Sequence, residues 1–364
     1  MEDGITLKSL ELNHFRSYKR EVLTFDSVGS ILVGPNGSGK TNVLEAISLF
    51  SPGKGLRKSK NHEISRNPEN LGWSIRGVFA TIEDLSEIDV SFKESGEKLI
   101  FLDGKRTNQS SMNKFVKILW ITPQMDRLWS LGASERRNFI DRITFSFFPN
   151  HAKIISSYEK LVRERNELLR QGKFENTWID SLERQIVNFG TKVFSNRAET
   201  VQILNESPEP ILGFPSPRLA IIGEVFLDED MYLLKLRQNR KLDSISGRTS
   251  LGPHRSDLNL TYIDKGIDAK DCSTGEQKAL LVSIMLSISK ELINKFGIKP
   301  ILLLDEIGAH LDDERRNKLM DHLFSLNVQF LITATEIDLF NINQKDINCI
   351  SVMNSNGMSV LNQG

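Results

Sequence analysis

The chain has 364 residues, with 47 lysines and arginines against 47 aspartates and glutamates, so its formal net charge is zero. This balance excludes a protein that binds nucleic acid through its charge as a whole, and any such site must be a local patch. The length favours two domains, or one domain with a large insertion.

The cysteine content and the absence of apolar runs indicate the compartment. Only Cys272 and Cys349 are present, which argues against a disulfide framework and favours a reducing environment. No uncharged apolar run approaches membrane-spanning length, and the acidic start of the chain lacks an apolar signal core. We therefore expect a cytoplasmic protein without a membrane partner.

The first elements lead to a glycine-rich loop. Loose alternation of apolar and polar residues predicts strands at Ile5–Phe15 and Glu21–Phe25, and an apolar run predicts a buried strand at Ser30–Val33. The next eight residues, 34–41, read Gly-Pro-Asn-Gly-Ser-Gly-Lys-Thr and fit the phosphate-binding loop pattern at every required position. Helical periodicity follows at Asn42–Ile47.

This loop has the chemistry that a nucleoside triphosphate needs. Glycines let backbone N–H groups approach the phosphates closely, and the following helix adds its positive dipole end. We expect Lys40 to lie on the β- and γ-phosphates of ATP and the Thr41 hydroxyl to be a ligand of Mg²⁺. A chance match in a glycine-rich turn is disfavoured by the flanking strand and helix. The predicted binding residues of the loop are Gly34, Pro35, Asn36, Gly37, Ser38, Gly39, Lys40 and Thr41.

A basic loop and a set of strands come next. Residues 51–60 carry four positive charges and no negative ones, so this loop either contacts phosphate, of ATP or of DNA, or is a solvated surface loop. Strands are predicted at 73–82, 87–92, 99–102 and 116–122, with a hairpin turn at Asp103-Gly104.

The pattern becomes helical after residue 126. Between 133 and 206 glycine is almost absent, and apolar residues recur at helical spacing, for example from Ile179 to Val193. Gly172 marks a break between two helices. The sequence therefore predicts an antiparallel helical arm, residues 126–214, inserted between an N-terminal lobe, 1–125, and a C-terminal lobe, 215–364.

The C-terminal lobe supplies two further motifs. Ser273-Thr274-Gly275-Glu276 opens a predicted helix, where a hydroxyl and free N–H groups suit an anion. The same residues form a capping box, and both interpretations can hold together. A buried strand, Ile301–Leu304, ends in Asp305 and Glu306.

The two acids fit the second half of a phosphate-loop ATPase site. Asp305 would hold Mg²⁺ through water, and Glu306 would polarise the attacking water. The long separation of Lys40 and Asp305 in the chain exceeds that of compact nucleotide-binding folds, and it independently indicates a head domain split by an insertion.

Together these motifs resemble the RecF family of bacterial recombination and repair ATPases, which are related to the heads of structural-maintenance-of-chromosomes (SMC) proteins. The similarity covers nearly the whole chain. It is carried by the phosphate loop with its helix, the signature at Ser273, Asp305-Glu306, and four further segments: Leu12–Tyr18, Glu135–Asp141, Tyr158–Leu169 with Arg165-Asn166, and Gly252–Arg255.

The resemblance implies an α/β fold, an ABC/SMC-like head with a mixed sheet and an inserted helical arm. It implies that Gln124 senses the γ-phosphate through the metal, so the expected Mg²⁺ residues are Thr41, Gln124 and Asp305. It also implies that Arg57 reaches ATP, and that Ser273 and Gly275 contact the nucleotide of a second subunit. Leu311-Asp312 would cross the dimer interface, and Glu306 would be the catalytic base.

Two departures bear on activity. Thr335 stands where transporters carry a switch histidine, which suggests slow hydrolysis, and the signature has Thr274 and Glu276 where the pattern has other residues. Taken alone, His254 reads as a structural histidine.

The predicted function is an ATP-driven dimer that closes on single- or double-stranded DNA at gaps. At most it would be a weak, DNA-stimulated ATPase. By resemblance it would act with RecO and RecR in recombinase loading, replication restart and SOS induction. Two alternatives stay open: an ATPase that uses ATP only as a conformational switch, and, less favoured, the ATPase subunit of a transporter.

Overall fold

The computed structural model describes residues 4–81, 84–172, 177–207, 210–309, 311–336, 347–355 and 357–363. The chain divides into two compact units. Unit 1 contains residues 1–127, 209–216 and 273–364, and unit 2 contains residues 128–208 and 217–272.

A six-stranded sheet in unit 1 carries the phosphate loop. Its order is β15-β14-β3-β13-β12-β8, and all neighbours are parallel except the edge pair β14 and β15. The strands are β3 (Gly29–Val33), β8 (Ile118–Ile121), β12 (Ile301–Leu304), β13 (Phe330–Ala334), β14 (Ile347–Ser355) and β15 (Met358–Gln363). Strands β8, β12 and β13 are buried along their whole length, as expected for short apolar runs in a parallel sheet.

The second sheet of unit 1 is antiparallel, in the order β2-β1-β4-β5-β6-β7. Its strands are β1 (Thr6–Phe15), β2 (Tyr18–Thr24), β4 (Trp73–Ala80), β5 (Leu85–Phe92), β6 (Lys98–Leu102) and β7 (Lys105–Arg106). Asp103 and Gly104 both have positive φ, 50° and 72°, in the tight turn between β6 and β7. This confirms the hairpin predicted there.

The helices of unit 1 are α1 (Lys40–Ser48), α2 (Asn61–Ile64), α3 (Gln109–Phe115), α9 (Thr274–Phe296) and α10 (Asp313–Ser325). The 3₁₀ segment η1 (Pro123–Ser130) begins in unit 1 and ends in unit 2. Residues of α1 and of both sheets form one apolar cluster, in which Val43, Leu44 and Ile47 of α1 are fully buried. Burial on this scale fixes the position of α1 and, through it, the end of the phosphate loop that α1 continues.

A side-chain amide links the strand β1 to the segment before β13. Gln329 Oε1 accepts from the N–H of Leu7 at 2.7 Å, and Gln329 Nε2 donates to the carbonyl of Leu7 at 2.8 Å. The amide thus makes the pair of bonds that a neighbouring strand would make, and it satisfies buried backbone groups at the start of β1.

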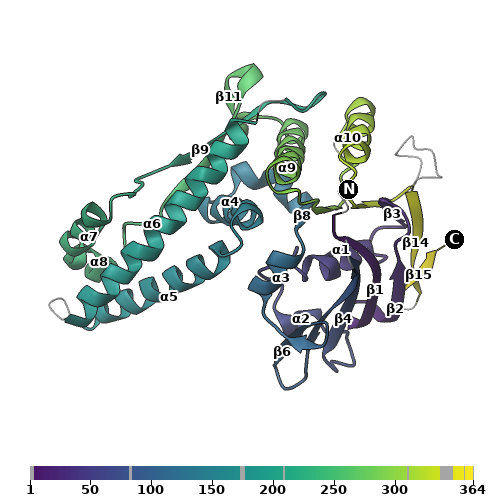
Figure 1. The fold of residues 1–364 in the computed structure, drawn as a ribbon, viewed down its shortest axis with the longest axis horizontal. Helices are drawn as coiled ribbons and strands as arrows, with labels where there is room; N and C mark the ends of the chain where they lie inside the picture. Colours follow the sequence, from purple (N-terminus) through teal and green to yellow (C-terminus); the bar gives the residue numbers. More distant parts are fainter. Residues whose placement is uncertain are drawn as a thin grey trace. The chain divides into compact units, whose positions relative to one another are not determined.

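Unit 2 combines helices with a small antiparallel sheet. The long helices α5 (His151–Arg170) and α6 (Thr177–Asn205) lie side by side, with Gly172 at φ 73° after the end of α5 (Figure 1). The other helices are α4 (Ala133–Phe147), α7 (Glu229–Gln238) and α8 (Arg240–Ser246). The sheet β11-β10-β9 consists of β9 (Pro217–Ile222), β10 (Asp257–Tyr262) and β11 (Ile267–Asp268), with short 3₁₀ turns η2 (Ile263–Lys265) and η3 (Ala269–Asp271).

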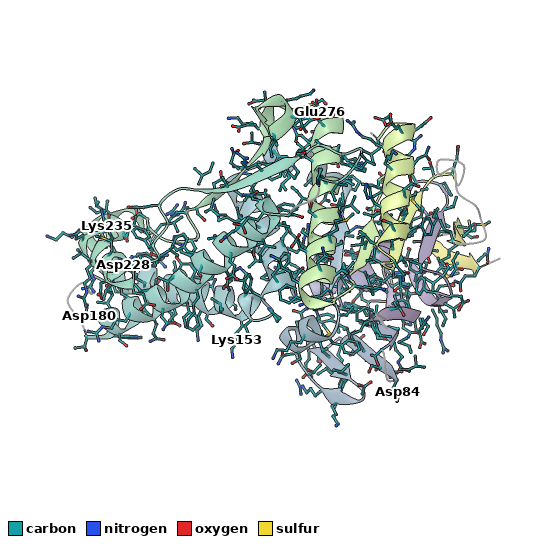
Figure 2. All side chains as sticks on the ribbon, turned by 45° about the horizontal axis from the view of Figure 1, so that its top comes forward. Asp84, Lys153, Asp180, Asp228, Lys235 and Glu276 are labelled. Atoms are coloured by element: carbon teal, nitrogen blue, oxygen red, sulfur yellow. The ribbon has the colours of Figure 1, made fainter. Side chains whose placement is uncertain are left out.

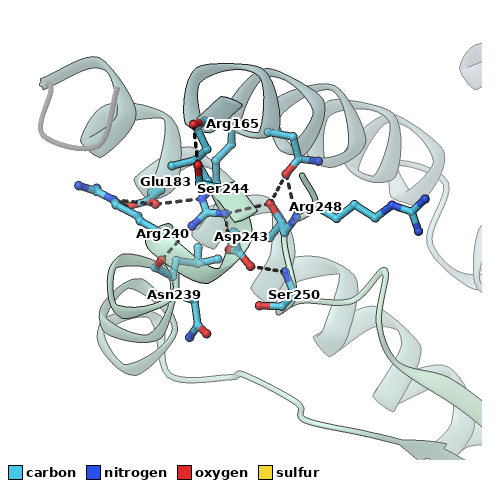
Figure 3. Close-up of polar contacts among 12 residues, drawn as sticks. Arg165, Glu183, Asn239, Arg240, Asp243, Ser244, Arg248 and Ser250 are labelled. Atoms are coloured by element: carbon cyan, nitrogen blue, oxygen red, sulfur yellow. Dashed lines mark hydrogen bonds and ion pairs between the residues drawn. The ribbon is translucent and has the colours of Figure 1, made fainter. Parts of the chain in front are cut away.

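An arginine lies fully buried between the helices of unit 2 (Figure 3). Arg165 of α5 contacts Glu183 of α6 at 2.9 Å and Asp243 of α8 at 2.6 Å, and it also donates to Thr249 Oγ1 and to the carbonyl of Leu236. Both acids are buried, and Glu183 also pairs with Arg240 at 2.5 Å, so two arginines balance the two carboxylates away from water. This network ties the C-terminal part of unit 2 to the helical pair.

A second network surrounds Gly252–Arg255. Arg197 makes two bonds to the Asp141 carboxylate, at 2.7 and 2.8 Å, and donates to the carbonyl of Pro253. His254 accepts from or donates to Tyr158 at 2.6 Å, and burial lowers the pKa of His254 to about 4. Gly252 leaves room for this contact, because a Cβ there would lie 2.2 Å from the Tyr158 hydroxyl.

The two units differ from the expected boundaries. Residues 217–272, expected in the C-terminal lobe of the head, group with the helices of unit 2, and residues 209–216 group with unit 1. The physical reason lies in the packing: Phe226, Tyr232 and Leu236 belong to the same apolar cluster as residues of α5 and α6.

Candidate nucleotide site

The phosphate loop has the backbone shape that its glycines predict. Gly37 and Gly39 have φ of 79° and 113°, in the left-handed region that other residues adopt at a cost. Gly34 is required for a different reason, because a Cβ there would lie 2.1 Å from the carbonyl oxygen of Val352 on β14. The loop is therefore pressed against the neighbouring strand, and helix α1 begins directly after it at Lys40.

The lysine of the loop folds back over the loop. Lys40 is buried, and its ammonium donates to the carbonyls of Gly34 at 2.5 Å and Pro35 at 2.9 Å. Burial lowers the pKa of Lys40, while the charges of Glu306 and Asp305 act in the opposite direction. The two acids are therefore near enough for their charge to act on the ammonium.

Asp305 connects three elements. Its Oδ1 accepts hydrogen bonds from Thr41 Oγ1 on α1 and from Thr333 Oγ1 on β13, each at 2.8 Å. Thr333 Oγ1 in turn accepts from the backbone N–H of Glu306 at 2.8 Å. The structure thus brings the predicted metal residues Thr41 and Asp305 into contact, and it adds Thr333.

The electrostatics of Asp305 suit a cation. Burial raises the pKa of this carboxyl group, the bonds from Thr333 and Thr41 lower it in part, and the charge of Glu306 raises it again. A carboxylate and a hydroxyl oxygen at hydrogen-bond distance are hard donors of the kind that Mg²⁺ prefers. The residues present therefore fit this ion.

Glu306 has a strained backbone. Its φ is 48° although it is not glycine, and it lies exposed in the turn that follows β12. Non-glycine residues in this region carry a conformational cost and cluster at functional sites. This geometry is consistent with the base role predicted for Glu306, which stays a prediction.

Arg57 and Asn42 meet beside a buried acid. Glu45 of α1 is fully buried and pairs with Arg16 at 2.6 Å and with Arg57 at 3.1 Å. Arg57 also donates to Asn42 Oδ1 at 2.7 Å. The first arginine after the loop is thus fixed at the flank of α1, with a third of its side chain exposed.

Gln124 lies at the same edge of the sheet as Asp305. It is an exposed residue of η1, three positions after Ile121, the last residue of β8. Ile121 pairs with Leu304, and the carbonyl of Ile121 accepts from the N–H of Asp305 at 2.9 Å. The parallel register therefore places both predicted metal residues just beyond the carboxyl ends of neighbouring strands.

The signature residues begin helix α9. Ser273 is the N-cap, and its hydroxyl, 3.3 Å from the N–H of Glu276, forms a capping box with that side chain. The Glu276 carboxylate accepts from the backbone N–H and the hydroxyl of Ser273, both at 2.8 Å. The capping-box interpretation is thus confirmed, with Ser273 exposed and Glu276 at the start of α9 (Figure 2). Binding of a second subunit's nucleotide by Ser273 and Gly275 stays a prediction.

A buried lysine that the sequence analysis did not single out joins three of these motifs. Lys278 of α9 is almost fully buried and pairs with Asp126 of η1 at 3.3 Å. Its ammonium donates to the carbonyls of Glu306 at 3.1 Å and Ala309 at 2.7 Å. The ammonium group of Lys278 therefore connects three segments: helix α9 with the signature, the segment after Gln124, and the turn after Glu306.

Thr333 and Glu45 were also missed. The available signal was weak: Thr333 lies at the end of the strand beside β12, where carboxyl ends of parallel strands gather functional groups. Glu45 stands between Leu44 and Ala46 in a run of buried apolar residues, and a charge in such a run signals a buried pair.

Comparison with known proteins agrees with this geometry. The family model described as the RecF/RecN/SMC N terminal domain matches residues 6–359. A protein of Rickettsia typhi called DNA replication and repair protein RecF is 37% identical over 345 residues, covering 92% of this chain and 96% of its own. A protein of the same name from Agrobacterium fabrum is also 37% identical, covering 94% of this chain and 95% of its own.

Solved structures show the same fold. One of the recombination mediator protein RecF-ATP in the RecFOR pathway has a TM-score of 0.82 at 23% identity and covers 99% of both chains. An Smc head domain from Pyrococcus furiosus, bound to the C-terminal domain of ScpA, has a TM-score of 0.57 at 19% identity, with 99% and 96% covered. These likenesses confirm the predicted α/β head of the ABC/SMC type. From the family model and the close relatives together, the chain belongs to the RecF family.

Proposed function

We propose that this chain is an ATP-dependent DNA-binding protein of replication and recombinational repair. The observation that carries the proposal is the triad of Thr41, Asp305 and Lys40 around a phosphate loop of the correct shape. The relatives named DNA replication and repair protein RecF, and the likeness to a RecF-ATP structure, support the same function.

The residues present define how ATP would be held. Backbone N–H groups of the loop and the dipole of α1 would face the phosphates, and Lys40 would exchange its loop carbonyls for phosphate oxygens. Thr41, Asp305 and Gln124 would hold Mg²⁺, which supplies charge neutralisation on the phosphates. Glu306 would orient the attacking water.

The mode of action proposed is a dimer that closes on DNA when ATP binds and opens after slow hydrolysis. Ser273 and Gly275 are exposed or half-buried at the start of α9, as contacts to a second subunit's nucleotide require. The partners implied by the family resemblance are RecO and RecR. Among the described residues, no helix is long and apolar enough to cross a membrane, and no observation favours a transporter ATPase.

The test compares the wild type with Lys40→Ala and Glu306→Gln, and with Lys295→Ala as a control far along α9. DNA binding and subunit mass are measured with and without Mg-ATP. We expect ATP to cause dimerisation and tighter DNA binding, Lys40→Ala to abolish both, and Glu306→Gln to prolong both. DNA binding that ignores ATP in every variant would contradict the proposal.

A second candidate, ATP as a conformational switch with incidental turnover, uses the same residues. The positive φ of Glu306 fits either role, because strained backbone occurs both at active sites and in switch regions. Comparing the residence time on DNA with the time taken by one hydrolysis event separates the two candidates. If the two times are equal, hydrolysis drives release from DNA. If release from DNA is much faster than hydrolysis, ATP acts as a switch.

A further inference from the structure

The C-terminal hairpin reaches the backbone of the phosphate loop. Ser359, the second residue of β15, is buried, and its Oγ lies 2.5 Å from the carbonyl oxygen of Ser38. Its backbone N–H donates to the carbonyl of Ser17 at 3.0 Å, which holds the serine against the turn between β1 and β2. Strand β15 and the turn between β1 and β2 therefore meet beside the backbone of the phosphate loop.

The hydrogen bonds around Ser359 have one direction. A carbonyl only accepts, so the single hydrogen of the Ser359 hydroxyl points to Ser38. The Ser17 hydroxyl, 2.7 Å away, then donates to Ser359, and the Asn42 amide donates to Ser17 at 2.8 Å. Arg57 fixes the orientation of that amide by donating to its oxygen at 2.7 Å. Aligned chains of this kind strengthen each member.

A tyrosine makes the equivalent contact one peptide further on. The Tyr18 hydroxyl donates to the carbonyl of Gly39 at 3.0 Å, and the side chain is fully buried. Burial raises the pKa of Tyr18 above its usual range, so the hydroxyl keeps the hydrogen that it donates. Gly39 is compatible with both contacts only as glycine, because a Cβ there would lie 2.5 Å from Ser359 Oγ and 3.0 Å from the Tyr18 hydroxyl.

These two contacts act on the N–H groups that face a phosphate. The carbonyl of Ser38 belongs to the same peptide group as the N–H of Gly39, and the carbonyl of Gly39 to the same group as the N–H of Lys40. A donor on a carbonyl polarises its peptide and strengthens the N–H at the other end. Both N–H groups lie at the start of α1, where the helix supplies no acceptor for them.

We propose that Ser359 and Tyr18 are positioning residues for the phosphates of ATP, which they serve by orienting and polarising the peptides that carry the N–H groups of Gly39 and Lys40. The proposal rests on the proposed ATP site and deepens it. The C-terminal hairpin is then part of the nucleotide site without touching the nucleotide.

The experiment measures the dissociation constant of Mg-ATP by calorimetry for the wild type, Ser359→Ala, Tyr18→Phe and Ser17→Ala. We expect the first two variants to bind roughly three- to tenfold more weakly, the effect of one lost hydrogen bond. Ser17→Ala should have a smaller effect, since Ser359 can still donate to Ser38. Tyr18→Phe removes a single oxygen and carries the test if Ser359→Ala does not fold.

Gln363→Ala is the matched control. Its amide holds the same strand, β15, to Thr24 of β2 with bonds of 3.0 and 2.6 Å. It should lower the melting temperature as Ser359→Ala does, yet leave ATP affinity unchanged. Affinities of Ser359→Ala and Tyr18→Phe equal to the wild type would overturn the inference. Failure of the wild type to bind ATP, or unchanged binding in Lys40→Ala, would instead overturn the proposed function.

Discussion

Thr41 and Asp305 are 264 positions apart in the chain, and yet Thr41 Oγ1 donates to Asp305 Oδ1 at 2.8 Å. The bond joins the helix of the phosphate loop to the end of β12. Burial nevertheless raises the pKa of Asp305, so its negative charge is unfavourable at this position.

The first prediction concerns pH. Because the folded-state pKa of Asp305 is raised, the native state binds the extra proton, and stability falls as pH rises from the usual carboxyl range through the raised pKa. Asp305→Asn keeps the Oδ1 acceptor for Thr41 and Thr333 but carries no charge. Its melting temperature without Mg²⁺ should therefore exceed that of the wild type at pH 7.5, and the difference should vanish in acid.

The control for this experiment is Asp321→Asn, an exposed change on α10 that should shift the melting temperature little at any pH. Mg-ATP should reverse the order, because it stabilises the wild type and not Asp305→Asn. A variant no more stable than the wild type at pH 7.5 would show that burial of this charge is not costly.

The second prediction concerns Lys278. Replacement by methionine leaves Asp126 and two carbonyls without the buried ammonium, and loss of one partner of a buried pair costs about 3–5 kcal/mol of unfolding free energy. Urea unfolding measures the loss. Lys295→Met, on the same helix but paired at the surface with Glu291, should cost less than about 1 kcal/mol. Equal costs would argue against a structural ion pair.

The third prediction concerns the strain at Glu306. Glycine adopts a positive φ freely, whereas alanine keeps the clash of its Cβ, so Glu306→Gly should be about 1 kcal/mol more stable than Glu306→Ala. Both variants should lose hydrolysis equally. Thermal melting without nucleotide tests the difference. If Glu306→Ala were as stable as Glu306→Gly, the backbone at residue 306 would carry no strain in solution.

The fourth prediction concerns Arg165 in unit 2. Arg165→Met leaves Glu183 and Asp243 buried without their shared cation, at a cost of about 3–5 kcal/mol. Hydrogen exchange should show faster opening of α5, α6 and α8. Arg163→Met, two residues before Arg165 on α5 and largely exposed, should change exchange little. Adding Glu183→Gln and Asp243→Asn to Arg165→Met should recover part of the loss.

The local elements of the site were predictable from sequence, because strand, glycine loop and helix are specified by adjacent residues. The strand at Ile301–Leu304 and the helix beginning at Thr274 were likewise confirmed. The place of these motifs in the fold was also predictable, because residues that directly follow parallel strands come together at one edge of the sheet.

The buried charges were not predictable. The sequence does not distinguish a buried lysine, glutamate or arginine from an exposed one. Only the fold shows that Lys278, Glu45 and Arg165 are buried and paired with opposite charges. Arg165 stood out in the sequence only through family resemblance. The grouping of residues 217–272 with the helices was missed for a related reason: apolar spacing predicts that Tyr232 and Leu236 are buried, but not against which element.

The order of strands in the parallel sheet has a consequence for the synthesis of the protein. Strand β3, which leads into the phosphate loop, pairs with β13 at residues 330–334 and with β14 at residues 347–351. While the chain emerges from the ribosome, β3 has neither neighbour until residues 330–351 have been translated. The nucleotide site therefore forms long after its phosphate loop has been synthesised, and only in chains in which β13 and β14 are in place.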